Sequence, residues 1–502
     1  MKKGKTTLLD HLYSRNESTM NTLGSFSKKI VYGVALVVIN YNLANAQLTA
    51  TGQLRTRTEY RAGQGTLQQK GDNPGIFTSQ RTRLNLGYTG YRFKVFTAVQ
   101  DVRVWGQDAS TINQTTTQSN NGLMLHEAWG EINFNDTGSL AKVENFSLKF
   151  GRQEIVYDDQ KILGNLDWLQ QARRHDAVIL KFANKGWITD LGAAFNQNGM
   201  LNTNSIYNGT PPNIATATTT TVTSAAPYTA GTNGIGTMYK SFQYAYLGKK
   251  FFFGNASLLF FKDDFSKYNL VSTKTGTVTT TSKNDQRGVW SRLTAGMFID
   301  ATIKRRLNVV ASYYHQGGQD KDGVFMNADL ASITTSLLIG RKLYVGPGFD
   351  YLSGNKGTSA TTSKTKNERF DPLYGTPHKF WGYMDYFYAA NGFGQQGLMN
   401  GFFKIKYNLK DNLILTLDAH AFYSANEVSN GKGGKQNPFL GSEYDFVVKY
   451  NITKMINIEA GYSIMESTST MSSAQVKNVT NPERTPQWAY LMLIIKPNFL
   501  AK

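Results

Sequence analysis

The sequence predicts an all-β protein, a single transmembrane antiparallel β-barrel of about 18 strands, with long extracellular loops and short periplasmic turns. Three observations indicate this fold class. Apolar and polar residues alternate with a period of two along much of the chain. Tight polar turns alternate with long loops of low complexity. A segment typical of a secretory leader precedes the first alternating stretch.

Residues 1–46 have the features of a signal peptide. A basic stretch at 27–29 is followed by an apolar run at 30–39 and by an Ala-x-Ala site at 44–46. A membrane anchor is the alternative, but a spanning helix needs roughly 20 apolar residues and this run is shorter. We therefore expect a mature chain that begins at Gln47.

Composition narrows the class of protein further. The chain has 29 Phe and 27 Tyr but only 11 Pro, which is typical of an all-β protein. Its formal net charge is +19, and excess positive charge attracts polyanions. Because the leader takes the chain out of the cytoplasm, we expect no nucleic-acid partner. The absence of cysteine excludes disulfides and thiol chemistry, and no residue spacing predicts a metal or a cofactor.

The first alternating stretch runs from Thr51 to Arg61. Three arginines and Glu59 occupy every second position, so one face of the strand is charged and the other is not. The same period recurs in segments 79–88, 91–105, 401–409, 413–423 and 443–451. Within 91–105 the parity slips at Asp101, which predicts a β-bulge that turns Arg103 inward.

Connections between the strands are of two kinds. Short polar turns close hairpins such as KYNLKDNLILTLDAH, KYNITKMINIEAGYS and YLGKKFFFGNASLLFF. Long polar loops are expected at 106–121, 196–237, 266–287, 353–369, 425–441 and 466–486. Short turns at one end and long loops at the other are typical of outer-membrane barrels. No linker interrupts this pattern, so we expect one domain over residues 47–502.

A soluble β-sandwich would show the same alternation, with its apolar face buried instead of facing lipid. A single sandwich of this length would exceed the usual domain size. A barrel also removes the open sheet edges, and aromatic residues near strand ends suit a membrane interface. These arguments favour the barrel, with the arginine face of Thr51–Arg61 lining a water-filled pore.

The segment from Phe146 to Phe182 begins and ends as a strand and carries a dense cluster of charges between. Such charge is unexpected in an ordinary loop between membrane strands. A loop folded into the lumen as a constriction accounts for it, with carboxylates orienting arginines by bidentate pairing.

This segment resembles the alginate export family of outer-membrane β-barrels. The resemblance rests on Gly151-Arg152-Gln153 after a strand, on Asp158-Asp159 after a tyrosine, on Trp168, and on Leu125–Gly130 with Glu127 and Trp129. RFDPLYGTPHKFWGYMDYF, at 369–387, is similar to a segment of family members from the bacteroidetes group. The resemblance implies an 18-stranded barrel with an arginine-lined constriction that passes an anionic polysaccharide.

On this interpretation the candidate residues fall into two groups. The pore lining that would bind substrate comprises Arg55, Arg57, Arg81, Arg83, Arg103, Arg152, Arg173, Arg174, Lys404 and Lys406. The supporting acids are Glu127, Asp158, Asp159 and Asp176.

The predicted function is passive, selective passage of an anionic polysaccharide or oligosaccharide across the outer membrane of a Gram-negative-type bacterium. Its expected partners are that saccharide, outer-membrane lipid and a periplasmic export machinery, and the barrel is expected to be monomeric. A general anion-preferring porin for small solutes is one alternative. An outer-membrane hydrolase is another, with His175–Asp176 or Asp371 and His378 as its candidate site. The sequence has no HExxH or GxSxG motif, so we expect no enzyme.

Overall fold

The computed structural model describes residues 47–106, 123–135, 144–196, 239–275, 278–355, 366–389 and 395–500, with the backbone alone for 272–285 and 287. The predicted leader and most of the predicted loops 106–121 and 196–237 lie outside the described residues. The account below concerns the compact unit within residues 49–87 and 92–502. Residues 47–48 and 88–91 belong to a second unit, and those at 47–48 and 88–90 are ends of β1 and β2.

Strands make up almost all of the regular structure in the described ranges. In chain order they are β1 Gln47–Ala62, β2 Gly75–Gly90, β3 Phe93–Val104, β4 Met124–Asn133, β5 Asn145–Gln153, β6 His175–Asn184, β7 Trp187–Phe195, β8 Ser241–Phe251, β9 Gly254–Thr275, β10 Val278–Ile303, β11 Leu307–Gly318, β12 Phe325–Met326, β13 Ala328–Ile339, β14 Leu343–Leu352, β15 Lys366–Asn367, β16 Leu398–Lys410, β17 Leu413–Ser424, β18 Phe439–Asn451, β19 Ile456–Ser467 and β20 Gln487–Ile495. The same ranges hold two short helices, η2 Pro377–Lys379 and α4 Ser469–Ser472. No helix in the described ranges is long and apolar enough to cross a membrane.

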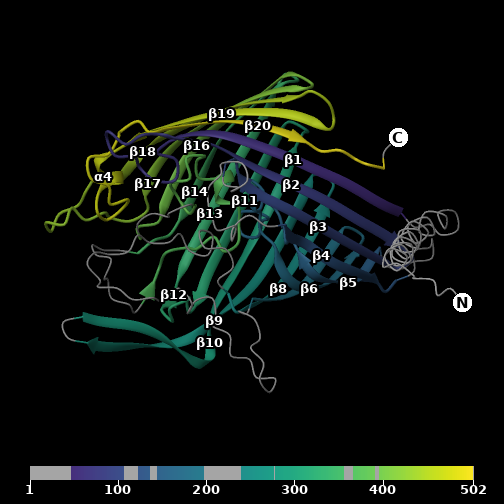
Figure 1. Cartoon of the computed structure of the whole chain (residues 1–502), viewed down its shortest axis with the longest axis horizontal. Coiled ribbons are helices and arrows are strands. Elements are labelled where there is room, and N and C mark those ends of the chain that lie inside the picture. Colours follow the sequence, from purple (N-terminus) through teal and green to yellow (C-terminus); the bar gives the residue numbers. More distant parts are fainter. Residues whose placement is uncertain are drawn as a thin grey trace, which may run out of the picture. The chain divides into compact units, whose positions relative to one another are not determined.

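Eighteen of the strands in the described ranges form one closed sheet. Each pairs with its neighbour in the chain, and β1 pairs with β20 to complete the ring (Figure 1). The pairing of β12 with β15 is separate and parallel. The predicted all-β, 18-stranded antiparallel barrel is therefore confirmed.

The strand faces follow the predicted alternation. In β1, Arg55 and Arg57 are each 3% exposed, whereas Leu54 is 38% and Tyr60 39% exposed. Apolar side chains outside and polar ones inside are the reverse of a soluble sandwich, and they are what a barrel in lipid requires.

The two ends of the barrel differ as expected. Turns of two to four residues join β16 to β17 and β18 to β19 at the periplasmic end. The expectation of a loop at 266–287 was wrong, because β9 and β10 continue as a long ladder past the other strands (Figure 1). Polar residues can pair in such a ladder because backbone hydrogen bonds hold it together irrespective of side chains.

The predicted irregularity near Asp101 is also located differently. The register between β3 and β4 shifts at Ala98 and Val99, where His126 is the extra residue on β4. This pairing extends along β3 only to Gln100, so it does not reach Asp101 or Arg103. Arg103 pairs with Asp101 at 2.6 Å and its side chain is 38% exposed, and its inward orientation stays a prediction.

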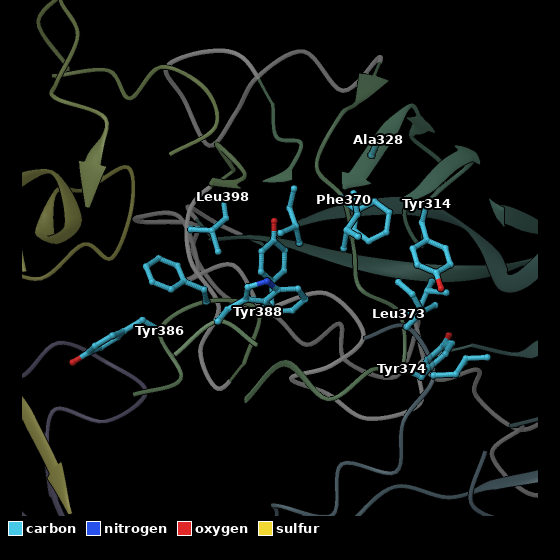
Figure 2. Packing of buried hydrophobic residues seen from close by; sticks show 14 of the residues in the cluster. Tyr314, Ala328, Phe370, Leu373, Tyr374, Tyr386, Tyr388 and Leu398 are labelled. Atoms are coloured by element: carbon cyan, nitrogen blue, oxygen red, sulfur yellow. The ribbon is translucent and has the colours of Figure 1, made fainter. Parts of the chain in front are cut away.

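The buried core lies inside the ring of strands. Residues of the segment between β14 and β16 supply much of it, including Phe370, Tyr374, Tyr386 and Tyr388, each at most 1% exposed. Figure 2 shows this packing together with Tyr314 and Leu398 of the wall. The lumen is thus partly filled by chain from the long-loop end.

Candidate binding site in the barrel lumen

Residues 154–174, between β5 and β6, form the first inward loop. Asp158 accepts hydrogen bonds from Tyr246 of β8 and Ser257 of β9 at 2.8 and 2.9 Å. Lys161 pairs with Asp350 of β14 at 3.1 Å. At its other end Asp167 pairs with Arg81 of β2 at 2.8 Å. A loop that contacts such separated strands crosses the lumen, as the charge cluster predicted.

The loop is compact because several residues adopt the left-handed conformation. Asp158, Gln160, Leu166 and Ala172 have φ between 51° and 73°. The Asp159 carboxylate accepts from Lys161 N at 2.9 Å, a local bond that favours a turn. Burial raises the pKa of Asp158 to about 6, opposed by the hydrogen bonds from Tyr246 and Ser257.

Arginines of β1 and β2 hold the loop through its backbone. Arg55 donates to Asp167 O at 2.8 Å and to Gln170 Oε1 at 2.9 Å. Arg57 donates to Trp168 O at 2.9 Å. Burial acts to raise the pKa of the Asp167 carboxyl, but the guanidinium groups of Arg81 and Arg55 outweigh it and hold that pKa below its usual value.

The expectation that this ladder faces open water is not met for Arg55, Arg57 and Arg81, which are 1–3% exposed. Loop carbonyls and carboxylates occupy their donors, because buried guanidinium groups need such partners. Arg83 is less enclosed and lies 3.7 Å from Glu154. Their role in setting anion preference stays a prediction.

Four planar groups stack in a column across the lumen. The Arg57 guanidinium lies 4.3 Å from the centroid of the Trp168 ring. Trp168 stacks on His378 at 4.3 Å, and His378 stacks on Tyr383 at 4.9 Å. His378 also bonds to Asp385 at 2.8 Å. The column joins β1 to both inward segments.

Residues 368–397, of which 368–389 and 395–397 are described, form the second inward loop. Asp371 pairs with Arg292 of β10 at 2.7 Å, and Tyr374 donates to Asp263 of β9 at 2.9 Å. On the opposite side Met384 N donates to Glu443 of β18 at 2.8 Å. This loop also crosses the lumen.

The two inward loops are bonded to each other. Tyr374 N donates to Ile162 O at 3.1 Å, and Gly164 N donates to Tyr374 O at 3.0 Å. Arg173 donates to Gly375 O at 2.7 Å, and burial lowers the pKa of Arg173 to about 10. The loops therefore form one layer that narrows the lumen.

The first inward loop and the arginines of β1 and β2 all lie in the N-terminal part of the chain. Residues 46–195 match the alginate export family. The resemblance seen at Gly151-Arg152-Gln153 and Trp168 is thereby confirmed for this part. The match does not extend to Arg369–Phe387, the second segment in which a resemblance was noted.

Solved structures of outer-membrane proteins share the fold. The outer membrane protein opdK from Pseudomonas aeruginosa is 10% identical, with a TM-score of 0.54, covering 90% of this chain and 99% of that one. Pseudomonas aeruginosa OpdO is 12% identical, with a TM-score of 0.53 and coverage of 90% and 98%. Acinetobacter baumannii OccAB4 is 11% identical, with a TM-score of 0.54 and coverage of 91% and 100%. No curated protein sequence matches the chain. The protein is an outer-membrane β-barrel of a Gram-negative-type bacterium.

Within residues 46–195, most of the predicted supporting acids have partners other than the expected arginines. Asp158 accepts hydrogen bonds from Tyr246 and Ser257, and Glu127 accepts one from Trp129 Nε1 at 3.2 Å. Asp176 does bind an arginine, Arg152, at 2.8 and 2.9 Å. Arg152 and Asp176 lie on the same strand faces as Phe150 and Val178, whose side chains point outward. The ion pair therefore lies outside the lumen. Arg174 is two residues before Asp176 in the chain.

Other carboxylates orient the arginines. Glu59 is 1% exposed and accepts from Arg57 and Arg61, both at 2.9 Å. Asp167 forms an ion pair with Arg81, and Glu154 forms one with Arg83. Glu59 could have been found from the sequence, because it shares the parity of the arginines. Asp167 and Glu154 required the path of the loop.

One cluster of side chains within residues 46–195 has the composition of a metal site. Ligand atoms of His126, Glu127 and Glu154 lie within 4.8 Å of one another. Glu154 already accepts from His126 at 2.8 Å and from Asn165 at 2.7 Å, and it lies beside Arg83. These contacts account for the cluster as a hydrogen-bonded network, and no metal chemistry follows from it.

In each of the two residue pairs considered as hydrolase sites, the two side chains bond to other partners and not to each other. His175 is buried and bonds to Tyr239 at 2.8 Å, while the oxygens of Asp176 face the other side of the sheet with Arg152. Asp371 pairs with Arg292, and His378 pairs instead with Asp385. Neither proposed pair forms a dyad.

A hollow of about 550 Å³ lies against the layer formed by the inward loops. Loop residues Trp168, His378, Lys379 and Tyr383 line it, together with wall residues that include Lys449. Burial lowers the pKa of Lys379, although the nearby Asp159 opposes this. Cationic and aromatic groups thus meet in one water-accessible space.

Proposed function

We propose that this protein is an outer-membrane channel that passes an anionic polysaccharide or oligosaccharide by passive diffusion. The observation that carries the proposal is the hollow beneath the inward loops. There the planar column ends at Tyr383, and Lys379 and Lys449 stand beside it. A sugar acid presents a carboxylate to cations and C–H faces to aromatic rings, so this combination suits it.

Weak sites in series allow an ion to enter and also to leave, whereas one deep site would block the pore. Lys379 donates to Asp159 O at 3.0 Å, and Lys449 lies opposite Glu459 across the sheet. The carbonyl occupies one N–H of Lys379, and the carboxylate of Glu459 offsets part of the field of Lys449, so the attraction of each lysine for a passing carboxylate is weak. The match to the alginate export family supports the class of substrate.

A general anion-preferring porin for small solutes is the second candidate. The layer of inward loops narrows the lumen, which favours small solutes over a polymer. The fold is also shared by OpdK, which has been crystallised with vanillate, a small carboxylate. Passage of a long chain is the property that separates the two candidates.

Single-channel recording of the refolded mature chain in a planar bilayer tests the proposal. We expect a reversal potential in a salt gradient that indicates anion selectivity, and reversible block by uronic-acid oligomers. Lys379→Gln and Lys449→Gln should each weaken the block, while Lys432→Gln, on an exposed outer loop, should not. Cation selectivity, or an absence of conductance, would refute the channel. Block by monomers equal to that by oligomers would favour the small-solute porin.

A further inference from the structure

A second hollow, of about 540 Å³, lies at the periplasmic end of the wall formed by β10, β11, β13, β14, β16 and β17. We call it the periplasmic vestibule. Its lining includes Arg305 and Arg306 of the turn between β10 and β11, and Lys404 and Lys406 of β16. Asp418 is its single carboxylate among the lining residues. The vestibule therefore carries a strong excess of positive charge.

The strand register builds this site. Lys406 lies opposite Tyr344 on one side and Thr416 on the other, and its ammonium is 5.3 Å from the centroid of the Tyr344 ring. Lys404 lies opposite Asp418 and bonds to it at 2.5 Å. The period of two points these side chains to the same face as buried Phe402, which is the lumen face.

The cations differ in how far they are neutralised. Lys404 is paired with Asp418. Within the described residues, no ion pair joins Arg305, Arg306 or Lys406 to a carboxylate of the chain, and all three are exposed. A backbone hydrogen bond from Arg306 N to Ile303 O, at 3.0 Å, holds the turn that carries Arg305 and Arg306. Three accessible cations thus line one hollow, and none of them is in an ion pair with a carboxylate of the described residues.

We propose that the periplasmic vestibule is the entry site for the carboxylates of an acidic saccharide that approaches from the periplasm. Arginine forks can take a carboxylate bidentately, and Lys406 with Tyr344 offers a cation beside an aromatic face. The site lies at the turn end of the lumen, before the layer of inward loops. The inference rests on the proposed function and adds a direction to it, because three accessible cations at this end can capture an anion that arrives from the periplasm.

Sided block in a planar bilayer tests the inference. The chain has no cysteine, so Lys454→Cys in a periplasmic turn and a membrane-impermeant thiol reagent report the orientation of each channel. Uronic-acid oligomers are added to one chamber at a time. We expect tighter block from the turn side, and the triple variant Arg305→Gln, Arg306→Gln, Lys406→Gln should weaken that block roughly tenfold while leaving block from the loop side unchanged.

The matched control is Lys250→Gln, Lys304→Gln, Lys342→Gln, which removes the same charge at the same end from residues that do not line the vestibule. Equal weakening in this control would assign the effect to diffuse surface charge and overturn the inference. Equal block from both sides, unaltered in the first triple variant, would overturn it while the proposed function stands. No block from either side would refute the proposed function itself. Heat-dependent mobility on electrophoresis confirms that each variant is folded.

Discussion

The Arg57 guanidinium lies 4.3 Å from the centroid of the Trp168 ring, and Arg57 also donates to the carbonyl of Trp168 at 2.9 Å. One arginine of the wall thus holds both the side chain and the backbone of the inward loop. Glu59 fixes that arginine from the other side at 2.9 Å. The arginines of β1 therefore position the first inward loop.

Removal of the Trp168 ring should loosen the layer of inward loops. Trp168→Ala deletes contacts with Arg57 and His378, and we expect the free energy of unfolding to fall by about 3 kcal/mol. Urea unfolding in detergent measures this, and limited proteolysis reports whether the loop becomes accessible. Trp168→Phe keeps a ring and should lose less than half as much. Equal losses in the two variants would show that the stacked column does not hold the loop.

Arg292 anchors the second inward loop through a buried ion pair. It binds Asp263 at 2.5 Å and Asp371 at 2.7 Å, and its side chain is 3% exposed. Arg292→Gln leaves Asp263 buried without its charged partner, so a loss of about 3–5 kcal/mol in unfolding free energy is expected. Arg61→Gln removes a pair whose arginine is 37% exposed and should cost less than about 1 kcal/mol. Similar urea midpoints for the two variants would contradict the anchoring role.

Stability should depend on the protonation of Asp158. Its pKa in the folded protein is about 6, above the value of about 3.9 for an unfolded aspartate, so the folded state binds the extra proton between these values. The resulting stability is present below about pH 4 and is lost as pH rises through about 6. Asp158→Asn cannot titrate, so its stability relative to wild type should rise by about 2 kcal/mol from pH 4 to pH 7.5.

Unfolding midpoints across this pH range measure the difference. Ser257→Ala removes a hydrogen bond to the charged carboxylate and should move the transition of the otherwise native protein to higher pH. Parallel pH profiles for wild type and Asp158→Asn would refute the assignment.

Gly382 allows the second inward loop to approach the wall. Its φ is +84°, and a Cβ there would lie 2.6 Å from the carboxylate oxygens of Glu443. Gly382→Ala should therefore destabilise the protein by about 2 kcal/mol through backbone strain and displacement of Glu443. Gly75→Ala, where a Cβ meets no atom within 4 Å, serves as the control in the same thermal unfolding assay. Equal melting temperatures for both variants would argue against a close fit at this point.

Much of the barrel could be predicted from local pattern. A period of two assigns Arg55 and Leu54 to opposite faces wherever the strand lies, and the polar turns fix which strands are neighbours. The pattern failed where a feature depends on a partner strand. His126 is the extra residue in the pairing of β3 with β4, so this irregularity could not be read from β3 alone.

Charge density alone indicated that residues 154–174 fold inward, because so many ionisable groups need partners or water. It could not show which ones meet. Arg55 and Gln170 are separated by 115 positions, and their contact exists because the loop crosses the lumen to β1. Asp176 lies on the other face of the sheet from His175 for a different reason, because consecutive residues of a strand point to opposite faces.

The class of fold and most of the strand faces could be predicted without the structure, since they follow from the two-residue period of a strand. Which cations form internal bonds and which stay accessible became clear from the folded chain alone. Arg57 is buried against Trp168, while Lys406 is exposed at the periplasmic end. Burial depends on what folds against a side chain, and the inward loops cover one part of the wall and leave the other open to water.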